Sequence, residues 1–155
     1  MPKQSIITDR LRSAVGVLSD PVFYKVDKDA IAQFTHVIGD CNPIYTDESH
    51  ASSSRHGRII APPTFLRSME PPLPGEAYPI SYPEVFDGGS QWEYFESVGD
   101  GDTISVSTQI LDLKERKGSL GPMLFIIRET TYINQMNKNV ASQRSTYIYY
   151  KTERL

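Results

Sequence analysis

The stretch "IGDCNPIYTDE", residues 38–48, gathers side chains capable of chemistry into one short segment. It holds the carboxylate of Asp40, the amide of Asn42, the rigid ring of Pro43 and the phenol of Tyr45. It contains no histidine, whose pKa of about 6.5 lets it both give and take a proton near neutral pH. A phenol, with a pKa of about 10, donates a hydrogen bond but seldom accepts a proton. The segment therefore has the composition of an active site without its general base.

Each of these residues also has a structural interpretation. Asp40 and Asn42 belong to the residue types that favour tight turns and accept hydrogen bonds from nearby backbone N–H groups. Tyr45 can pack at a subunit interface. Asp47 and Glu48 suit the cap and the first turn of a short helix. Both interpretations of Asp40, Asn42 and Tyr45 stay open at this level.

Other residues capable of chemistry are scattered along the chain. His56, in "SRHGR", either packs or replaces the missing base from a new direction. Cys41 is expected to be a small buried residue. The remaining candidates are interpreted as packing or solvated side chains: His36, His50, Trp92, Arg128 and Arg144.

The elements that must position this segment form two halves. Apolar residues at helical spacing predict a helix that is capped by Asp27 or Asp29 and ends at Gly39. The pair Pro62–Pro63 suits the start of a second, buried helix through "TFLRSM". The segment between Met69 and Gly89 is expected to be stiff and irregular. Alternating apolar and polar residues predict strands at 22–26, 89–98, 102–116, 121–135 and 139–152.

The order of elements predicts an α+β domain in which a helix covers one face of an antiparallel sheet. A sheet covered in this way leaves an edge and a face exposed, so we expect the chain to dimerise. The 155 residues suit a single domain, with its core at about 22–150.

Composition argues against several classes of function. The net charge of −3 is mixed along the chain, without the basic stripe of a nucleic-acid-binding protein. No apolar run is long enough to span a membrane, and no signal peptide is evident. One cysteine and three scattered histidines have no zinc-ligand spacing, so we expect no metal site and a cytoplasmic location.

The segments "GDCNPIYTDESHA" and "GRIIAPPTFL" together resemble the MaoC-like dehydratase family, and more narrowly its N-terminal, fatty-acid-synthase-like branch. Three later segments are similar to strands of that branch: "GGSQWEYFESVGDGDTISV", "GPMLFIIRETTYINQ" and "VASQRSTYIYY". The resemblance implies a hot-dog fold, in which a curved antiparallel sheet wraps around a central helix. It also implies paired hot dogs and an acyl-thioester substrate on coenzyme A or acyl carrier protein, with no further cofactor.

In catalytic members the motif reads Asp, any residue, Asn, Pro, any residue, His. Here Asp40, Asn42 and Pro43 match, and Tyr45 stands at the histidine position. Catalytic relatives also commonly have a glycine where this chain has Pro63, which carries no N–H to bind the thioester oxygen. The resemblance implies Asp40 as the catalytic residue and places the substrate near Asn42, Tyr45, His56, Ala61, Pro62, Pro63 and Thr64.

These departures favour a hot-dog subunit of a (3R)-hydroxyacyl-thioester dehydratase or enoyl-thioester hydratase that has lost its own base. Such a half would pair with a second hot-dog subunit that carries the complete Asp and His. Two alternatives remain. The chain is a self-sufficient homodimeric hydratase with another proton carrier, or it binds an acyl thioester without turnover.

Overall fold

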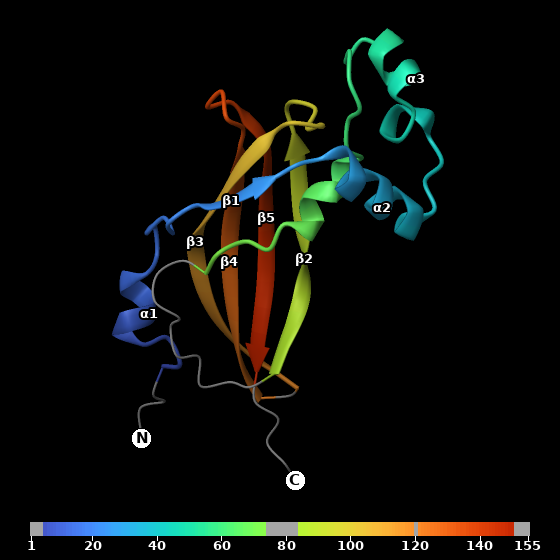
Figure 1. The fold of residues 1–155 in the computed structure, drawn as a ribbon. Coiled ribbons are helices and arrows are strands. Elements are labelled where there is room, and N and C mark those ends of the chain that lie inside the picture. Colours follow the sequence, from blue (N-terminus) through green and yellow to red (C-terminus); the bar gives the residue numbers. More distant parts are fainter. Residues whose placement is uncertain (1–4, 74–83, 120, 151–155) are drawn as a thin grey trace.

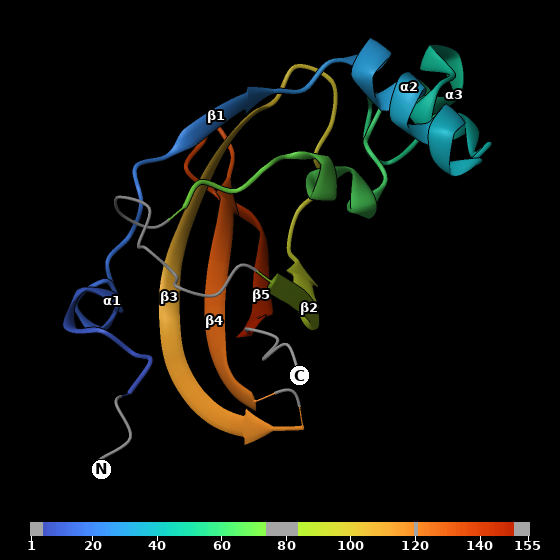
Figure 2. The same ribbon diagram turned by 90° about the horizontal axis from the view of Figure 1, so that it is seen from below.

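The computed structural model describes residues 5–73, 84–119 and 121–150. Five strands form one antiparallel sheet in the order β1-β3-β4-β5-β2, so that β1 and β2 are its two outer strands (Figure 1). Figure 2 shows the sheet strongly curved, with the long strand β3 bending along its length. The strands are β1 Val22–Lys25, β2 Glu84–Tyr94, β3 Thr103–Gly118, β4 Gly121–Ile133 and β5 Asn139–Tyr150.

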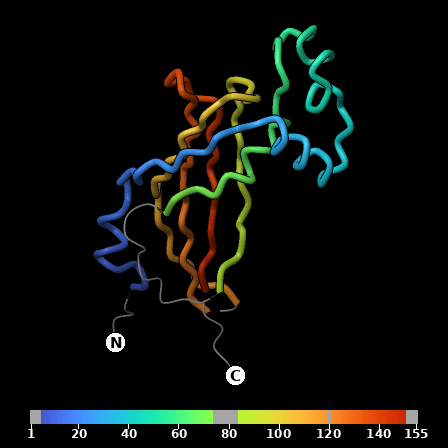
Figure 3. Tube along the Cα trace, in the orientation of Figure 1, coloured from blue at the N-terminus to red at the C-terminus, as the bar shows by residue number. Residues whose placement is uncertain are grey.

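Short helical segments accompany this sheet. After β1 the chain leaves the sheet through α2 and α3 and returns to it at η2, as the path in Figure 3 shows. The α-helices are α1 Asp9–Ser13, α2 Lys28–Ile38 and α3 Glu48–Ser53, and the 3₁₀ helices are η1 Pro43–Tyr45 and η2 Pro63–Ser68.

The helix α2 forms where the sequence predicts it. Asp27 accepts a hydrogen bond from the backbone N–H of Ala30, and Gly39 ends the helix in the left-handed conformation at φ 73°. Ile31 is fully buried. Val37 and Ile38, which share the helical apolar pattern, are instead 76% and 47% exposed. The helix therefore presents apolar side chains to solvent as well as to the core.

The helix expected to begin at the proline pair is much shorter than a central hot-dog helix. Segment η2 is a 3₁₀ helix of six residues that ends at Ser68. Pro71 and Pro72 follow closely, and proline both lacks a backbone N–H and disfavours helical geometry in the residue before it. Phe65 and Leu66 are nonetheless buried as expected.

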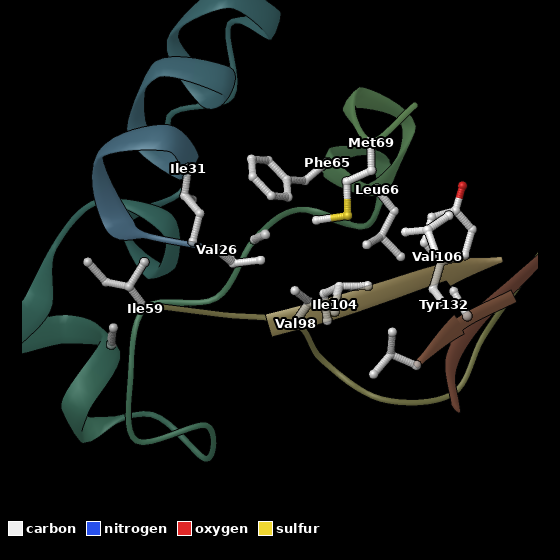
Figure 4. Close-up of a cluster of buried hydrophobic side chains, with 14 residues drawn as sticks. Val26, Ile31, Ile59, Phe65, Leu66, Met69, Val98, Ile104, Val106 and Tyr132 are labelled. Atoms are coloured by element: carbon white, nitrogen blue, oxygen red, sulfur yellow. The ribbon is translucent and has the colours of Figure 1, made fainter. Parts of the chain in front are cut away.

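The main hydrophobic core lies between these helical segments and one end of the sheet. Figure 4 shows Phe65 and Leu66 of η2, with Met69 directly after it, in one cluster with Ile31 of α2 and Val106 of β3. A smaller cluster joins Leu11 of α1 to Ile110, Leu124 and Ile126 farther along the sheet. Burial of these side chains positions η2, and with it the proline pair, over the inner face of the sheet.

The edges of the sheet differ from the expected pattern. Strand β2 begins at Glu84, earlier than the predicted residue 89, and has a bulge between Asp87 and Ser90. Most of β2 is exposed, including Val85 and Phe86. Of the segment 69–89, expected to be irregular, residues 74–83 lie outside the described residues, and residues 84–89 form a strand instead. Among the described residues, β2 forms one outer edge of the sheet with eleven residues, and β1 forms the other with four.

Candidate functional site

The motif segment folds into a turn that its own polar side chains stabilise. The backbone N–H of Asn42 donates to Oδ1 of Asp40 at 3.1 Å. The backbone N–H of Ile44 donates to Oδ1 of Asn42, also at 3.1 Å, so Asn42 caps η1. Both side chains thus use an oxygen to hold the backbone, as the structural interpretation predicts.

Tyr45 ends η1 and lies half-buried against the main core. Burial raises the pKa of its phenol, and the nearby negative charge of Asp40 raises it further. The phenol therefore stays protonated at neutral pH, where it can take part in hydrogen bonds but does not accept a proton. The motif retains its carboxylate but holds no group next to it that accepts a proton at pH 7.

A cavity of about 320 Å³ opens beside this turn. The residues that line this cavity include Tyr45, His56 and the consecutive residues Ala61, Pro62 and Pro63. These are five of the eight residues that the sequence predicts for the site. Asp40 and Asn42 are not among the lining residues, and Thr64 faces a neighbouring pocket instead.

Backbone hydrogen bonds hold the start of η2 in place. Ala61 donates its N–H to the carbonyl of Val98 at 2.8 Å, and Phe65 donates to the carbonyl of Pro62 at 2.8 Å. Pro63 has no N–H to offer. Pro63 therefore lines the cavity without a backbone N–H, and Thr64 lines the neighbouring pocket.

His56 lies in the cavity lining with both ring nitrogens in hydrogen bonds. Arg55 Nε, which can only donate, lies 3.2 Å from His56 Nε2, so this nitrogen accepts. His56 Nδ1 lies 3.2 Å from Ser97 Oγ. In a neutral ring Nδ1 then carries the hydrogen and donates to Ser97. The nitrogen that would act as a base is occupied by Arg55.

A second, apolar pocket of about 530 Å³ lies on the other side of η2. Its floor is Trp92, stacked on Tyr94 at 5.7 Å between ring centroids and 7° between planes. Phe34 and Ile38 of α2 form a further wall, with Arg67 at η2. Tyr94 lines both pockets. Trp92 also packs against the core, at 5.4 Å from Tyr132, so the predicted packing role is compatible with a role as a pocket wall.

Sequence reasoning missed an ion pair that holds the return segment to the sheet. Arg58 donates two hydrogen bonds to Asp102, at 3.0 and 2.8 Å. Asp102 is 2% exposed and also accepts from the backbone N–H of Gly99 and from Gln135. Burial alone would raise the pKa of Asp102, but these hydrogen bonds and the charge of Arg58 outweigh it and lower the pKa. Nothing in the local sequence distinguishes Asp102 from a turn residue.

Three isolated predictions have clear outcomes. Cys41 was expected to be buried and is exposed. Arg128 was expected to be solvated and is only 7% exposed, with its guanidinium 4.4 Å from the ring centre of Tyr147. Arg144 is solvated as predicted and pairs with Glu129 at 3.3 Å.

Within residues 5–73, 84–119 and 121–150, no helix combines the length and apolar character needed to cross a membrane. In the same described ranges, no cluster of three His, Cys, Asp or Glu side chains is placed to hold a metal ion.

Comparison with known proteins places these features in one family. The family model of the FAS1-like dehydratase domain region matches residues 13–143. A UPF0336 protein of Streptomyces coelicolor is 32% identical over 101 residues, which cover 62% of this chain and 67% of that protein. A probable enoyl-CoA hydratase alpha subunit of Thermomonospora curvata is 28% identical over 140 residues, which cover 77% of this chain and 43% of that protein.

Solved structures share the architecture. The ChsH1-ChsH2 complex of Mycobacterium tuberculosis contains a chain with a TM-score of 0.75 and 22% identity, over 88% of this chain and 90% of that chain. The HadBC (3R-hydroxyacyl-ACP dehydratase) complex of the same organism gives 0.68 and 14%, over 87% and 96%. At these identities the likeness establishes the hot-dog fold.

Proposed function

Because the chain belongs to the FAS1-like dehydratase family, we propose that it is the non-catalytic half of an enoyl-thioester hydratase or (3R)-hydroxyacyl-thioester dehydratase. A second hot-dog subunit would supply the complete Asp and His pair. The observation that carries this proposal is Tyr45, a protonated phenol at the position of the proton carrier, next to a carboxylate that holds its own turn.

The chemistry of hydration explains why tyrosine in place of histidine at residue 45 matters. Hydration of an enoyl thioester adds the hydroxyl of water to the β-carbon and a proton to the α-carbon, and dehydration reverses both steps. One group must take a proton from water while another returns one to carbon. Tyr45, with its raised pKa, can fill neither role efficiently at pH 7. His56 is a poor substitute, because Arg55 occupies the nitrogen that would accept the proton.

The two pockets support the proposal that this non-catalytic chain still binds the substrate. We propose that the thioester lies in the cavity next to Tyr45 and that the acyl group extends past Tyr94 onto Trp92. The second pocket is lined mainly by apolar and aromatic side chains, which suits a hydrophobic acyl group. Its volume of about 530 Å³ suits a long or bulky group. The chain thus contributes a wall of the acyl site rather than its acid and base.

The exposed edge of strand β2 supports the proposal of a partner subunit. Its edge carries exposed apolar side chains and backbone groups with no neighbouring strand among the described residues. A strand of another subunit can pair with such an edge and cover its apolar residues. Tyr94, at the end of β2, lines both pockets, so a subunit docked on this strand would lie next to the site. Both relatives of known structure described above are complexes.

The test has two parts. The purified chain alone should not hydrate a short trans-2-enoyl-CoA, followed by loss of the enoyl absorbance. The complex recovered from the native host should hydrate it and contain a second hot-dog chain. Recovery of active homodimers would instead support the self-sufficient enzyme. Ligand-dependent thermal stabilisation without turnover, even with the second chain present, would support a binding module.

A further inference from the structure

Arg55 and His56 form a polar group in the lining of the cavity, and the proposed function gives this group no role. Both residues line the cavity together with Ser97, on segments that follow α3 and β2. The contact of Arg55 Nε with His56 Nε2 and that of His56 Nδ1 with Ser97 Oγ form a chain of three side chains. This chain fixes the direction of a guanidinium that is otherwise exposed.

The guanidinium of Arg55 has donors to spare. Its Nε serves His56, and it forms no ion pair within 4 Å with any carboxylate of the described residues. The nearby Arg58 is different, because Asp102 and the carbonyl of Asp100 engage both of its terminal nitrogens. Arg55, which lines the cavity, therefore has two terminal amino groups without a carboxylate partner among the described residues, in the fork geometry that matches a phosphate.

The remaining charge at the cavity does not cancel that of Arg55. Glu96 also lines it, but its carboxylate pairs with Lys138 at 3.4 Å. An acyl thioester on either biological carrier ends in a phosphorylated pantetheine arm, which is anionic. Such a ligand suits a cation in one cavity and apolar walls in the next, and the two neighbouring pockets, which share Tyr94, provide this combination.

We propose that Arg55, positioned by His56 and Ser97, binds a phosphate of the thioester carrier. The inference rests on the proposed function, because it takes the ligand to be a pantetheine thioester. It assigns recognition of the carrier to this chain and makes Arg55 a binding residue. His56 becomes a positioning residue rather than a base. The shared chemistry is a phosphate on pantetheine, which coenzyme A and acyl carrier protein both have.

The experiment is calorimetric titration of the full chain at low ionic strength with pantetheine, 4′-phosphopantetheine and coenzyme A. Arg55→Gln should weaken binding of coenzyme A about tenfold and leave pantetheine binding unchanged. Arg55→Lys, which keeps the charge without the fork, should lose about threefold. Arg144→Gln, which removes an exposed arginine on β5, is the matched control and should bind all three ligands as the wild type does.

The two carriers give different patterns. Equal losses for phosphopantetheine and coenzyme A in Arg55→Gln would support a contact to the phosphate common to both carriers. A loss for coenzyme A alone would support a contact to its nucleotide phosphates. Wild-type affinity for coenzyme A in Arg55→Gln would overturn the inference and leave the proposed function intact. Absence of binding by the wild-type chain to all three ligands would overturn both.

Discussion

The carboxylate of Asp40 acts electrostatically on the phenol of Tyr45, five residues along the same motif turn. Burial of Tyr45 and the charge of Asp40 both raise the pKa of the phenol. A histidine at this position would gain from the same carboxylate, because a negative neighbour favours the protonated imidazole. A phenol with a raised pKa therefore keeps its proton at neutral pH, whereas a histidine at this position could exchange one.

The first prediction concerns Asp40 in the active complex. Asp40→Asn keeps an acceptor for the backbone N–H of Asn42, so the turn should survive. Hydratase kcat/KM of the complex should stay within about twofold, whereas the same change in the partner's motif should reduce it by about a hundredfold or more. A loss of that size for Asp40→Asn in this chain would make Asp40 catalytic.

The apolar pocket can be followed through Trp92, the only tryptophan in the chain. Binding of a long-chain or ring-containing acyl-CoA should shift its emission, because the ligand would cover the indole. Ile38→Glu places a charge in the pocket lining and should weaken this response about tenfold. Val17→Glu is the matched control, since Val17 and Ile38 are both 47% exposed. An unchanged titration in Ile38→Glu would show that the acyl group does not bind in this pocket.

If the partner subunit pairs along β2, a charge introduced on this edge should weaken association, and a charge on the β1 edge should not. Val85→Lys should weaken association with the partner, seen as dissociation at micromolar concentration in analytical ultracentrifugation, because it charges an apolar edge. Phe23→Lys removes an exposed aromatic residue from the opposite edge, on β1, and should leave association unchanged. The reverse result would move the interface to β1.

The Arg58–Asp102 pair predicts a pH dependence of stability. The pKa of Asp102 is lowered in the folded chain, so its contribution is present above the unfolded-state pKa of about 4 and is lost as the pH falls through the folded value. Asp102→Asn should lower the free energy of unfolding at pH 7 by roughly 2–4 kcal/mol in urea titrations, because it breaks a buried pair. It should also flatten the acid side of the stability curve.

The control for this pair is an exposed one. Asp112 and Lys114 lie 3.2 Å apart with both side chains more than half exposed. Asp112→Asn should change the free energy of unfolding by less than about 1 kcal/mol. Equal effects of the two substitutions would mean that Asp102 contributes no more than a surface charge.

Gly99 allows the close approach that this pair requires. A Cβ at residue 99 would lie 2.4 Å from the carbonyl oxygen of Ile59, a rigid backbone atom. Gly99→Ala should therefore destabilise the chain by about 1–3 kcal/mol in the same titrations. Gly118→Ala meets only the flexible end of Met123 and should cost less. A neutral Gly99→Ala would show that the return segment can shift away from the sheet.

Local signals in the sequence were sufficient for the features that depend on near neighbours. The caps of α2 at Asp27 and Gly39, the turn at Asp40 and Asn42, and the strand pattern of β3 to β5 all depend on residues a few positions apart. The length of η2 could also have been predicted, because Pro71 and Pro72 already stand in the sequence after Met69.

The sequence by itself determined the family, the sheet and the absence of histidine from the motif, because each is a property of residue type and spacing. Tertiary structure decided which residues share a cavity and which charges are neutralised. His56 meets Ser97 and Arg58 meets Asp102 across more than forty positions of the chain. Burial raises the pKa of Tyr45, whereas hydrogen bonds and the charge of Arg58 lower the pKa of Asp102 against the effect of burial, and both depend on segments that are distant in the sequence.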